Sequence, residues 1–372
     1  MTAPLDGRTL IVADPTLVLR LDGVRLLLQR QGKEVASVPI HELSQVVLQG
    51  PITVTGAALG ALMEGGVDVS LLSSHGKLRG YVQPVESKNV FLLLAQVAYW
   101  NDLPRRMPFV RAVVAGKIAG QRRLLQRYAW NRGSSLCAQA AEDLEQLLAR
   151  IEAAQDDEAL RGLEGTAAAR YFGVFGEMLS PPWTFPGRVR RPPTDPVNAL
   201  LSLGYTLLGA EMGRFLMRRG FDLRIGLFHG LRYGRQSLPL DLIEEFRAPL
   251  VDRFVLKLLN LKQLNPTHFE TLEGGAVRLN AEGRRIFYEG WEKLLMERAV
   301  RLPDGNEHAD DPLELRAERG GLLSDPGTAV VTWRHRIERQ VARFRRHLMK
   351  NVPYRPLIPW PNNKPQEEKE VS

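Results

Sequence analysis

The stretch PLDLIEEFRAPLVDRFVLKLL, residues 239–259, reads as one long helix that is kinked near Pro249. At 100° per residue, Glu244 lies on the apolar stripe of this helix. The residues aligned with it are Leu240, Ala248, Val251, Val255 and Leu258. Its neighbour Glu245 points instead toward Asp241 and Asp252, on the polar edge. A carboxylate on the packing side of a helix must be protonated, paired with a cation or bound to a metal.

A second candidate helix, LEGTAAARYFGVF at residues 163–175, places Glu164 in the same way. The residues aligned with it are Ala168, Tyr171, Phe175 and Met178. His229 lies in the segment GLFHG, residues 226–230, where two glycines let the imidazole turn toward a partner helix. Two carboxylates and one imidazole therefore make Glu164, His229 and Glu244 a candidate metal site.

Each of these residues also has a simpler interpretation. Glu164 could be a first-turn acid that complements the helix dipole, which contributes about 0.3–1 kcal/mol. Glu244 has the same alternative, since Asp241 and Glu245 could serve the dipole equally well. A lone histidine such as His229 is more often a hydrogen-bonded core residue than a ligand. The packing-side direction of Glu244 favours the metal site.

The bulk composition narrows the class of protein. The chain has 372 residues, of which 44% are hydrophobic, so it can bury one large core or two modest ones. Its net charge of +8 and sequence pI of about 9.7 favour a polyanionic partner. The single cysteine, Cys137, excludes an internal disulfide and a cysteine-rich zinc module. There is no signal-peptide pattern and no apolar run of roughly 20 residues, so no membrane segment and a cytoplasmic location are expected.

The periodicity of the apolar residues changes once along the chain. Residues 8 to about 83 are predicted to be rich in strands, and LVLRLDGVRLLL, residues 17–28, is typical of a hairpin that turns at Asp22 and Gly23. From Val90 onward the pattern becomes helical, interrupted by a small predicted hairpin at 269–279. The predicted helices are 91–101, 106–132, 138–155, 163–179, 196–219, 239–262, 281–300 and 327–350.

These patterns predict an α+β fold class, with a small N-terminal β-sheet domain followed by a larger all-α-helical domain that carries the candidate site. The expected divisions are a β-rich dimerisation domain at 1–84, a linker at 85–92, the helical metal-dependent catalytic domain at 93–350 and a flexible C-terminal tail at 351–372. Dimerisation through the β-rich domain is expected because its strands cannot easily close a core alone.

Five segments resemble one known family in their order and spacing. Two are N-terminal, VPIHELSQVVLQG at 38–50 and VSLLSSHG at 69–76. The more specific three are RPPTDPVNALLSLGY at 191–205, GLFHG at 226–230 and LDLIEEFRAPLVDR at 240–253. The family is CRISPR-associated protein one, the integrase-endonuclease of spacer acquisition, and the resemblance covers the whole chain except the tail.

The resemblance implies more than the residues alone. It implies that Glu164, His229 and Glu244 are the metal ligands, with Asp241 as a second acid one turn before the last of them. Glu245 departs from the family, which commonly has proline there. The resemblance also implies a homodimer, and two dimers bridged by the small CRISPR-associated protein two. Integration of DNA, with cleavage as a side activity, is the implied reaction.

The chemistry of the ligand set agrees with these implications. Two carboxylates and one imidazole suit Mg²⁺ or Mn²⁺, although three such ligands could also hold zinc. Attack on a phosphodiester by water gives cleavage, whereas attack by a 3′-hydroxyl gives strand joining. The arginine supply suits a double-stranded DNA partner. The clusters are Arg188, Arg190 and Arg191; Arg232 and Arg235; Arg122, Arg123, Arg127 and Arg132; and Arg334, Arg336, Arg339, Arg343, Arg345 and Arg346.

The predicted function is therefore CRISPR adaptation, in which a metal-dependent endonuclease and integrase joins the 3′-OH ends of short DNA fragments to the CRISPR array. Two alternatives stay open on the sequence. One is a nuclease that resolves branched DNA in repair. The other is a non-enzymatic, basic DNA-scaffolding protein whose acidic residues are structural.

Overall fold

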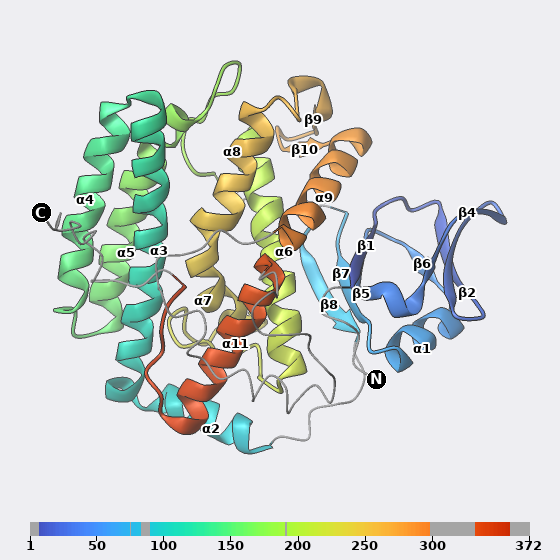
Figure 1. Cartoon of the computed structure of the whole chain (residues 1–372), viewed down its shortest axis with the longest axis horizontal. Helices are drawn as coiled ribbons and strands as arrows, with labels where there is room; N and C mark the ends of the chain where they lie inside the picture. Colours follow the sequence, from blue (N-terminus) through green and yellow to red (C-terminus); the bar gives the residue numbers. More distant parts are fainter. Residues whose placement is uncertain (1–6, 75, 83–89, 190–191, 298–331, 358–372) are drawn as a thin grey trace, which may run out of the picture.

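The strand-rich part of the chain forms two four-stranded sheets beside a bundle of helices (Figure 1). The computed structural model describes residues 7–74, 76–82, 90–189, 192–297 and 332–357. In spatial order, the first sheet contains β1 (Arg8–Val12), β5 (Leu43–Gln49), β7 (Asp68–Leu72) and β8 (Leu78–Val82). The second contains β4 (Lys33–Pro39), β3 (Arg25–Arg30), β2 (Leu17–Asp22) and β6 (Thr53–Val54). Helix α1 (Gly56–Glu64) contacts β2 and β7.

The predicted hairpin is formed by β2 and β3, which pair in antiparallel register. Asp22 pairs with Arg25, so the two turn residues are Gly23 and Val24. Gly23 has a φ of +54°, a conformation that glycine adopts without the steric penalty other residues incur. The turn therefore lies one residue later than the sequence predicted.

Strand β5 is buried along its whole length, because it separates two hydrophobic cores. It runs parallel to both β1 and β7. Since successive side chains of a strand point to opposite faces, Val46 packs in the core between the two sheets while Val47 packs in the core of the helical part. The first sheet is thus covered on both faces, which accounts for the near-continuous apolar run of β5.

The helical part follows the predicted helices closely, and the α+β fold class is confirmed. Two connections between helices contain the short hairpin β9 (Phe269–Thr271) with β10 (Val277–Leu279), as predicted, and the 3₁₀ turn Phe175–Met178. None of the helices that the structure describes is both long and apolar enough to cross a membrane. The helices are α2 (Val90–Asn101), α3 (Leu103–Arg132), α4 (Ser135–Ile151), α5 (Asp157–Gly173), α6 (Pro196–Arg218), α7 (Ser237–Phe246), α8 (Arg253–Asn260), α9 (Ala281–Met296) and α11 (Trp333–Lys350).

Helix α5 begins six residues before the predicted start. Asp156 caps its N-terminus by accepting the N–H of Ala159, so the helix includes both glycines that flank Glu164. Glu164 therefore lies in the middle of the helix, and Glu244 lies in the last turn of α7. The interpretation of either residue as a first-turn acid is wrong.

The predicted kink near Pro249 is a π-helical segment, Arg247–Asp252, that joins α7 to α8 without a break. Proline lacks the N–H that a regular turn needs, and a widened turn accommodates this. Asp252, at the end of the segment, is fully buried and accepts hydrogen bonds from the hydroxyls of Tyr171, at 2.8 Å, and Tyr205. Burial raises the pKa of Asp252 to about 6, although these hydrogen bonds and Arg247 act in the opposite direction.

The C-terminal segment that follows α11 is packed where a flexible tail was predicted. Glu245 accepts hydrogen bonds from the Tyr354 hydroxyl at 2.5 Å and from the N–H of Leu357. Both residues are buried, and Glu245 is fully inaccessible to solvent. The prediction of a tail is therefore wrong for residues 351–357, and residues 358–372 lie outside the described part of the chain.

The assignment of Glu245, Asp241 and Asp252 to an exposed polar edge is also wrong. Their side chains are at most 1% exposed, because the loop before α7, the C-terminal segment and helices α5 and α6 cover this side of the helix. The edge is polar, as the helical periodicity indicated, but it lies inside the protein.

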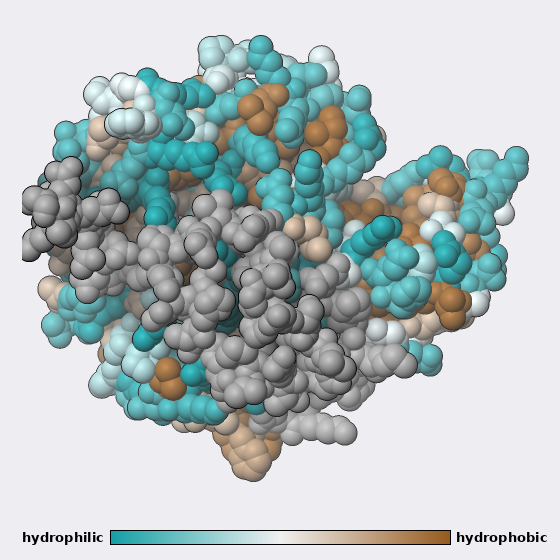
Figure 2. All heavy atoms as spheres, in the orientation of Figure 1, coloured by the Kyte–Doolittle hydropathy of each residue, from teal (hydrophilic) through white to brown (hydrophobic). Residues whose placement is uncertain are grey.

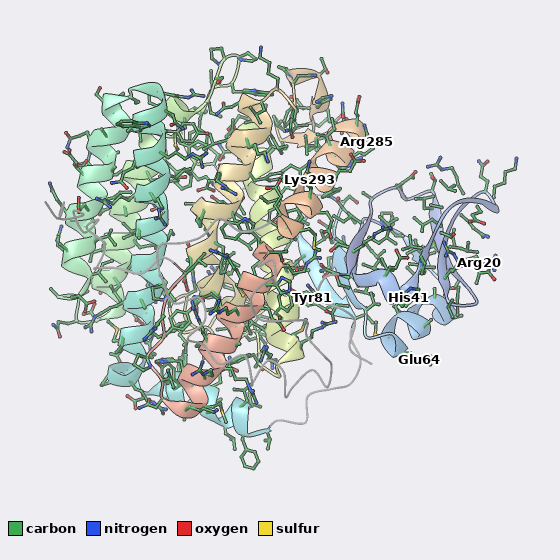
Figure 3. The ribbon with its side chains drawn as sticks, viewed as in Figure 1. Arg20, His41, Glu64, Tyr81, Arg285 and Lys293 are labelled. Atoms are coloured by element: carbon green, nitrogen blue, oxygen red, sulfur yellow. The ribbon has the colours of Figure 1, made fainter. Side chains whose placement is uncertain are left out.

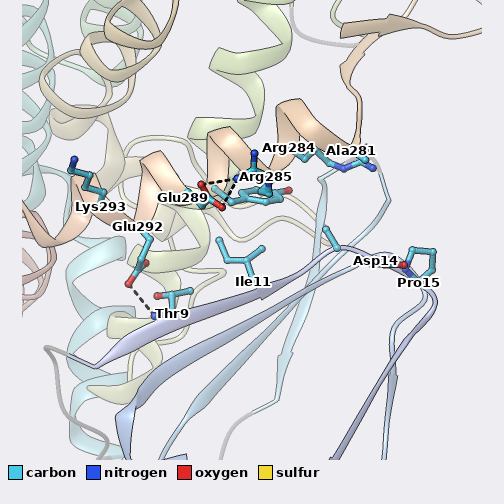
Figure 4. A pocket seen from close by; sticks show the side chains of 12 residues that line it. Thr9, Ile11, Asp14, Pro15, Ala281, Arg284, Arg285, Glu289, Glu292 and Lys293 are labelled. Carbon is cyan, nitrogen blue, oxygen red and sulfur yellow. Dashed lines mark hydrogen bonds and ion pairs between the residues drawn. The ribbon is translucent and has the colours of Figure 1, made fainter. Parts of the chain in front are cut away.

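A network of buried ion pairs joins the first sheet to the helices. Arg214 of α6 contacts Asp68 of β7 at 3.2 Å and Glu211 at 2.6 Å. Arg334 of α11 contacts Glu211 at 3.0 Å and also reaches Glu292 of α9 at 3.0 Å. Breaking one pair would leave an uncompensated buried charge, so the network specifies how the two parts dock. Beside it, a groove of about 810 Å³ runs between β1 and α9 (Figure 4).

Gly213 allows β8 to approach α6 closely. Tyr81, labelled at this boundary in Figure 3, lies so near that a Cβ on Gly213 would overlap its hydroxyl. Gly209 lies in the same helix with nothing within 4 Å of the corresponding position.

We expect Gly213→Ala to destabilise the protein by about 2 kcal/mol, because the strand or the tyrosine must shift. Gly209→Ala is the matched control and should stabilise by up to about 1 kcal/mol, since alanine favours a helix. Thermal unfolding of the two variants checks this. Equal effects of the two substitutions would contradict the close packing of β8 on α6.

We expect the buried Asp252 to make stability depend on pH. Its pKa rises from about 4 in the unfolded chain to about 6 in the folded one, so its contribution is present below about pH 4 and is lost by about pH 6. The shift corresponds to about 3 kcal/mol. The free energy of unfolding of Asp252→Asn should therefore rise relative to that of the wild type between pH 4 and 6. Above pH 6 the difference between the two free energies should stay constant, as measured by urea unfolding. A difference that stays constant across these pH values would rule out the shifted pKa.

Candidate functional site

The predicted site residues come together from three separate elements. Glu164 lies on α5, Glu244 on α7, and His229 in the loop between α6 and α7. Lys117 of α3 stands between the two carboxylates, with its Nζ 2.7 Å from Oε2 of Glu244 and paired with Oε1 of Glu164. His229 Nε2 lies 3.8 Å from Oε1 of Glu244. The two carboxylates therefore meet at a lysine that was not predicted, and His229 lies beside one of them.

Glu244 is held in its ionised form by the cations around it. Its side chain is only 3% exposed, and burial alone would favour the neutral acid. Arg247, whose Nη2 lies 3.1 Å from Oε1, together with Lys117 and His229 outweighs burial and lowers the pKa of Glu244 to about 2. This carboxylate is thus anionic throughout the physiological range and is available as a ligand.

Asp241 fixes the loop that carries His229. Its Oδ2 accepts the N–H of Leu227 at 2.6 Å and of Phe228 at 3.1 Å, and its Oδ1 accepts the N–H of His229 at 3.0 Å. Gly226 allows this approach, because a Cβ there would lie 2.9 Å from Oδ2. The carboxylate of Asp241, which is 0% exposed, therefore receives almost all of its hydrogen bonds from one loop.

The same aspartate also sets the tautomer of the histidine. His229 Nδ1 lies 2.6 Å from Oδ1 of Asp241, a carboxylate that can only accept a hydrogen bond when ionised. The proton of a neutral imidazole is therefore held on Nδ1, and the lone pair of Nε2 faces the side of Glu244. Carboxylate–histidine pairs of this kind orient metal ligands in many proteins.

Among the described residues, no group of three or more His, Cys, Asp or Glu side chains is already arranged around a common point as metal ligands would be. The ammonium of Lys117 occupies the space between the carboxylates. The donor set nonetheless fits a divalent ion. Glu244 Oε2 is buried and accepts no hydrogen bond of good geometry, and Nε2 of His229 lies 3.8 Å from the other oxygen of the same carboxylate.

Arg247 and Arg188 extend the positive charge away from the site. The guanidinium of Arg247 lies 4.6 Å from the centre of the Tyr205 ring, and that of Arg188 lies 5.5 Å from it. Both cations are thus held over one aromatic ring beside Glu244. Arg188 was predicted only as one of the DNA-binding arginines, and Arg247 was not predicted, although it lies three residues after Glu244, at helical contact spacing.

Several arginines of the predicted DNA-binding clusters are used inside the protein instead. Arg334 is 1% exposed and belongs to the ion-pair network between sheet and helices, and Arg336 is also buried. Arg132 donates to the carbonyl of Leu179 and to Ser180. Arg190 and Arg191 lie outside the described residues. Of the cluster on α3, Arg123 and Arg127 are exposed.

Comparison with known proteins gives a consistent result for most of the chain. A model of the family described as CRISPR associated protein Cas1 matches residues 10–293. CRISPR-associated endonuclease Cas1 2 of Rhodospirillum rubrum is 37% identical over 286 residues, 74% of this chain and 82% of that protein. CRISPR-associated endonuclease Cas1 3 of Thermus thermophilus is 36% identical over 293 residues, 78% of this chain and 86% of that protein.

Solved structures share the fold at lower identity. A Cas1 protein from Thermotoga maritima has a TM-score of 0.74 at 21% identity, covering 96% of this chain and 100% of that one. A casposase bound to its integration product has a TM-score of 0.78 at 21% identity, covering 94% and 92%. The Cas6-RT-Cas1–Cas2 complex has a TM-score of 0.75 at 24% identity, covering 98% of this chain and 37% of that one.

We expect Asp241→Ala to destabilise the protein by about 3 kcal/mol, because three backbone N–H groups of the loop lose their acceptor. The nitrogen NMR signals of His229 should also lose the single Nδ1–H tautomer. Asp222→Ala is the control: this carboxylate lies earlier in the same loop and pairs with the exposed Arg224, so its loss should cost less than about 1 kcal/mol. Two variants of equal stability would contradict the role of Asp241.

Proposed function

The chain belongs to the CRISPR-associated protein Cas1 family, and we propose that it joins the 3′-OH ends of short DNA fragments to a CRISPR array with Glu164, His229 and Glu244 as its metal ligands. The predicted family and the prediction of an endonuclease are confirmed, because the curated relatives are CRISPR-associated endonucleases at 36–37% identity. The non-enzymatic scaffolding alternative is therefore not retained. The observation that carries the ligand assignment is the meeting of two carboxylates from different helices at one cation, beside an imidazole nitrogen.

The oxygen-rich donor set with one nitrogen favours Mg²⁺ or Mn²⁺ as the ion. When bound, such an ion would polarise a phosphodiester and lower the pKa of an attacking hydroxyl or water. The protein's own contribution is to hold the ligand side chains in the charge state and orientation that a metal ion requires. Arg247 and Lys117 keep Glu244 ionised, and Asp241 orients the imidazole of His229 through its contact with Nδ1, so that Nε2 is turned toward Glu244.

The same site supports two outcomes that differ only in the attacking oxygen. When a 3′-hydroxyl attacks, a new phosphodiester forms, the old one breaks, and the leaving 3′-oxygen takes up a proton. When water attacks, the DNA strand is cleaved and leaves two free ends. The fold shared with a casposase bound to its integration product favours joining as the principal reaction.

We propose double-stranded DNA, a second copy of this chain and the small protein Cas2 as partners. A Cas1–Cas2 assembly is among the structures that share this fold. For the homodimer, the β-rich part is the interface that the sequence predicts. Helix α2 offers a second apolar surface, since Val90, Phe91 and Leu94 are 56%, 71% and 60% exposed, and brown atoms mark its position at the lower edge of Figure 2.

We expect Glu244→Gln and Glu164→Gln each to reduce DNA joining by about 10³-fold or more, and a chelator to do the same to the wild type. DNA binding should survive in both variants, because phosphate contacts by arginines supply it. Glu158→Gln is the matched control: this acid lies on the same helix as Glu164 but is exposed. The assay is joining of a labelled duplex to a supercoiled target carrying CRISPR repeats. Undiminished joining by either Gln variant would overturn the ligand assignment.

Fragments that end in a 3′-dideoxynucleotide separate joining from hydrolysis. The proposal expects them to give no joined product while cleavage of the target persists at a low level. The remaining alternative is a nuclease of branched DNA. Such an enzyme would cleave Holliday-type or flap substrates equally well with normal and with dideoxy 3′ ends, and it would form no joined product even with normal 3′ ends.

A further inference from the structure

Lys117 is the only cation that touches both candidate ligand carboxylates in the described structure. It lies on α3, where its side chain is 7% exposed, so its charge is not solvated but neutralised by Glu164 and Glu244. Neighbouring Gly116 lets α3 pack closely against α7 and the C-terminal segment, because a Cβ there would crowd Glu245 at 3.2 Å and Pro356 at 3.0 Å.

The charges of this cluster balance without any added ion. Two carboxylates, Glu164 and Glu244, face two cations, Lys117 and Arg247. Without Lys117, the two carboxylates would repel each other at short range in a medium of low dielectric constant. A bound divalent ion in addition to Lys117 would leave the cluster with excess positive charge.

The ammonium and a metal ion would also compete for space. An ammonium donates hydrogen bonds at about 2.8 Å, whereas Mg²⁺ and Mn²⁺ bind carboxylate oxygens at about 2.1 Å. An ion bridging Oε1 of Glu164 and Oε2 of Glu244 would compete with Nζ for the same two oxygens, since Nζ pairs with the first and lies 2.7 Å from the second. The two cations therefore exclude each other between these oxygens.

We propose that Lys117 is a placeholder for the metal: it holds the two carboxylates together in the ion-free protein and must leave its position when the divalent ion binds. The inference rests on the proposed function, since it takes Glu164 and Glu244 as ligands. Lys117 is in this sense a positioning residue, which keeps the site assembled without an ion and lowers the affinity for it. The ligand class is a hard divalent cation with oxygen ligands.

The test compares Mn²⁺ binding and stability of the full-length wild type with Lys117→Met, which keeps the length and shape of the side chain without its charge. We expect the variant to bind Mn²⁺ at least about tenfold more tightly by isothermal titration calorimetry, because a repelling charge has been removed. Its melting temperature should be lowered in EDTA and should recover toward that of the wild type in saturating Mn²⁺. Lys257→Met, which removes a half-exposed lysine paired with Glu297, should change neither quantity.

A purely structural lysine predicts a different pattern. It would lower the melting temperature equally with and without Mn²⁺ and would leave the Mn²⁺ affinity unchanged or weaker, and either result overturns the proposal. If Lys117→Met does not fold, Lys117→Gln gives the same comparison. Acetylation of Lys117 in the wild type, followed by mass spectrometry, gives a test without any variant: the reaction should be at least about threefold faster in Mn²⁺, and an unchanged rate overturns the proposal.

His229→Ala distinguishes this inference from the proposed function. If Mn²⁺ binding is the same in His229→Ala and the wild type, the assignment of the ligands fails and the placeholder role fails with it. If binding depends on His229 but is not strengthened in Lys117→Met, only the placeholder role fails.

Discussion

Four buried carboxylates on the continuous helix formed by α7, the π-helical segment and α8 must each find partners inside the protein, and the arrangement of the neighbouring elements follows from this requirement. Asp241 binds the preceding loop, and Glu244 connects the helix to α3 and α5 through Lys117. Glu245 holds the C-terminal segment, and Asp252 accepts from tyrosines of α5 and α6. Leaving any of these acids ionised without partners would cost several kcal/mol. The candidate site is the point at which two of these connections meet.

Much of this arrangement could be predicted from the sequence where local chemistry is decisive. The limits of α6 follow from Asp195 as its cap, Pro196 in its first turn and the glycine at 220, and they were predicted within one residue. The direction of Glu244 followed from helical periodicity alone. The start of α5 was misplaced because two glycines beside Glu164 resemble a turn, whereas the capping side chain of Asp156 begins the helix before them.

What the sequence did not reveal depends on contacts between distant segments. Helical periodicity put Glu245 on a polar edge, but only the fold shows that Tyr354 and Leu357, more than 100 residues later, cover that edge. Lys117 left one local signal, since it is the only charge in the apolar run VVAGKIAG at 113–120. The basic composition was misleading in part, because Arg214 and Arg334 are used inside the protein to join its two parts.

The widened turn at Arg247–Asp252 makes the fold sensitive to the number of residues in this segment, independently of which residues they are. Losing one residue there would let the helix close regular turns, yet it would rotate everything downstream by about 100°. Asp252 would then face away from its two tyrosines, and the apolar side of α8 would turn out of the core. Insertions and deletions should therefore be far rarer in this segment than substitutions, with Pro249 as the residue that keeps the wider register favourable.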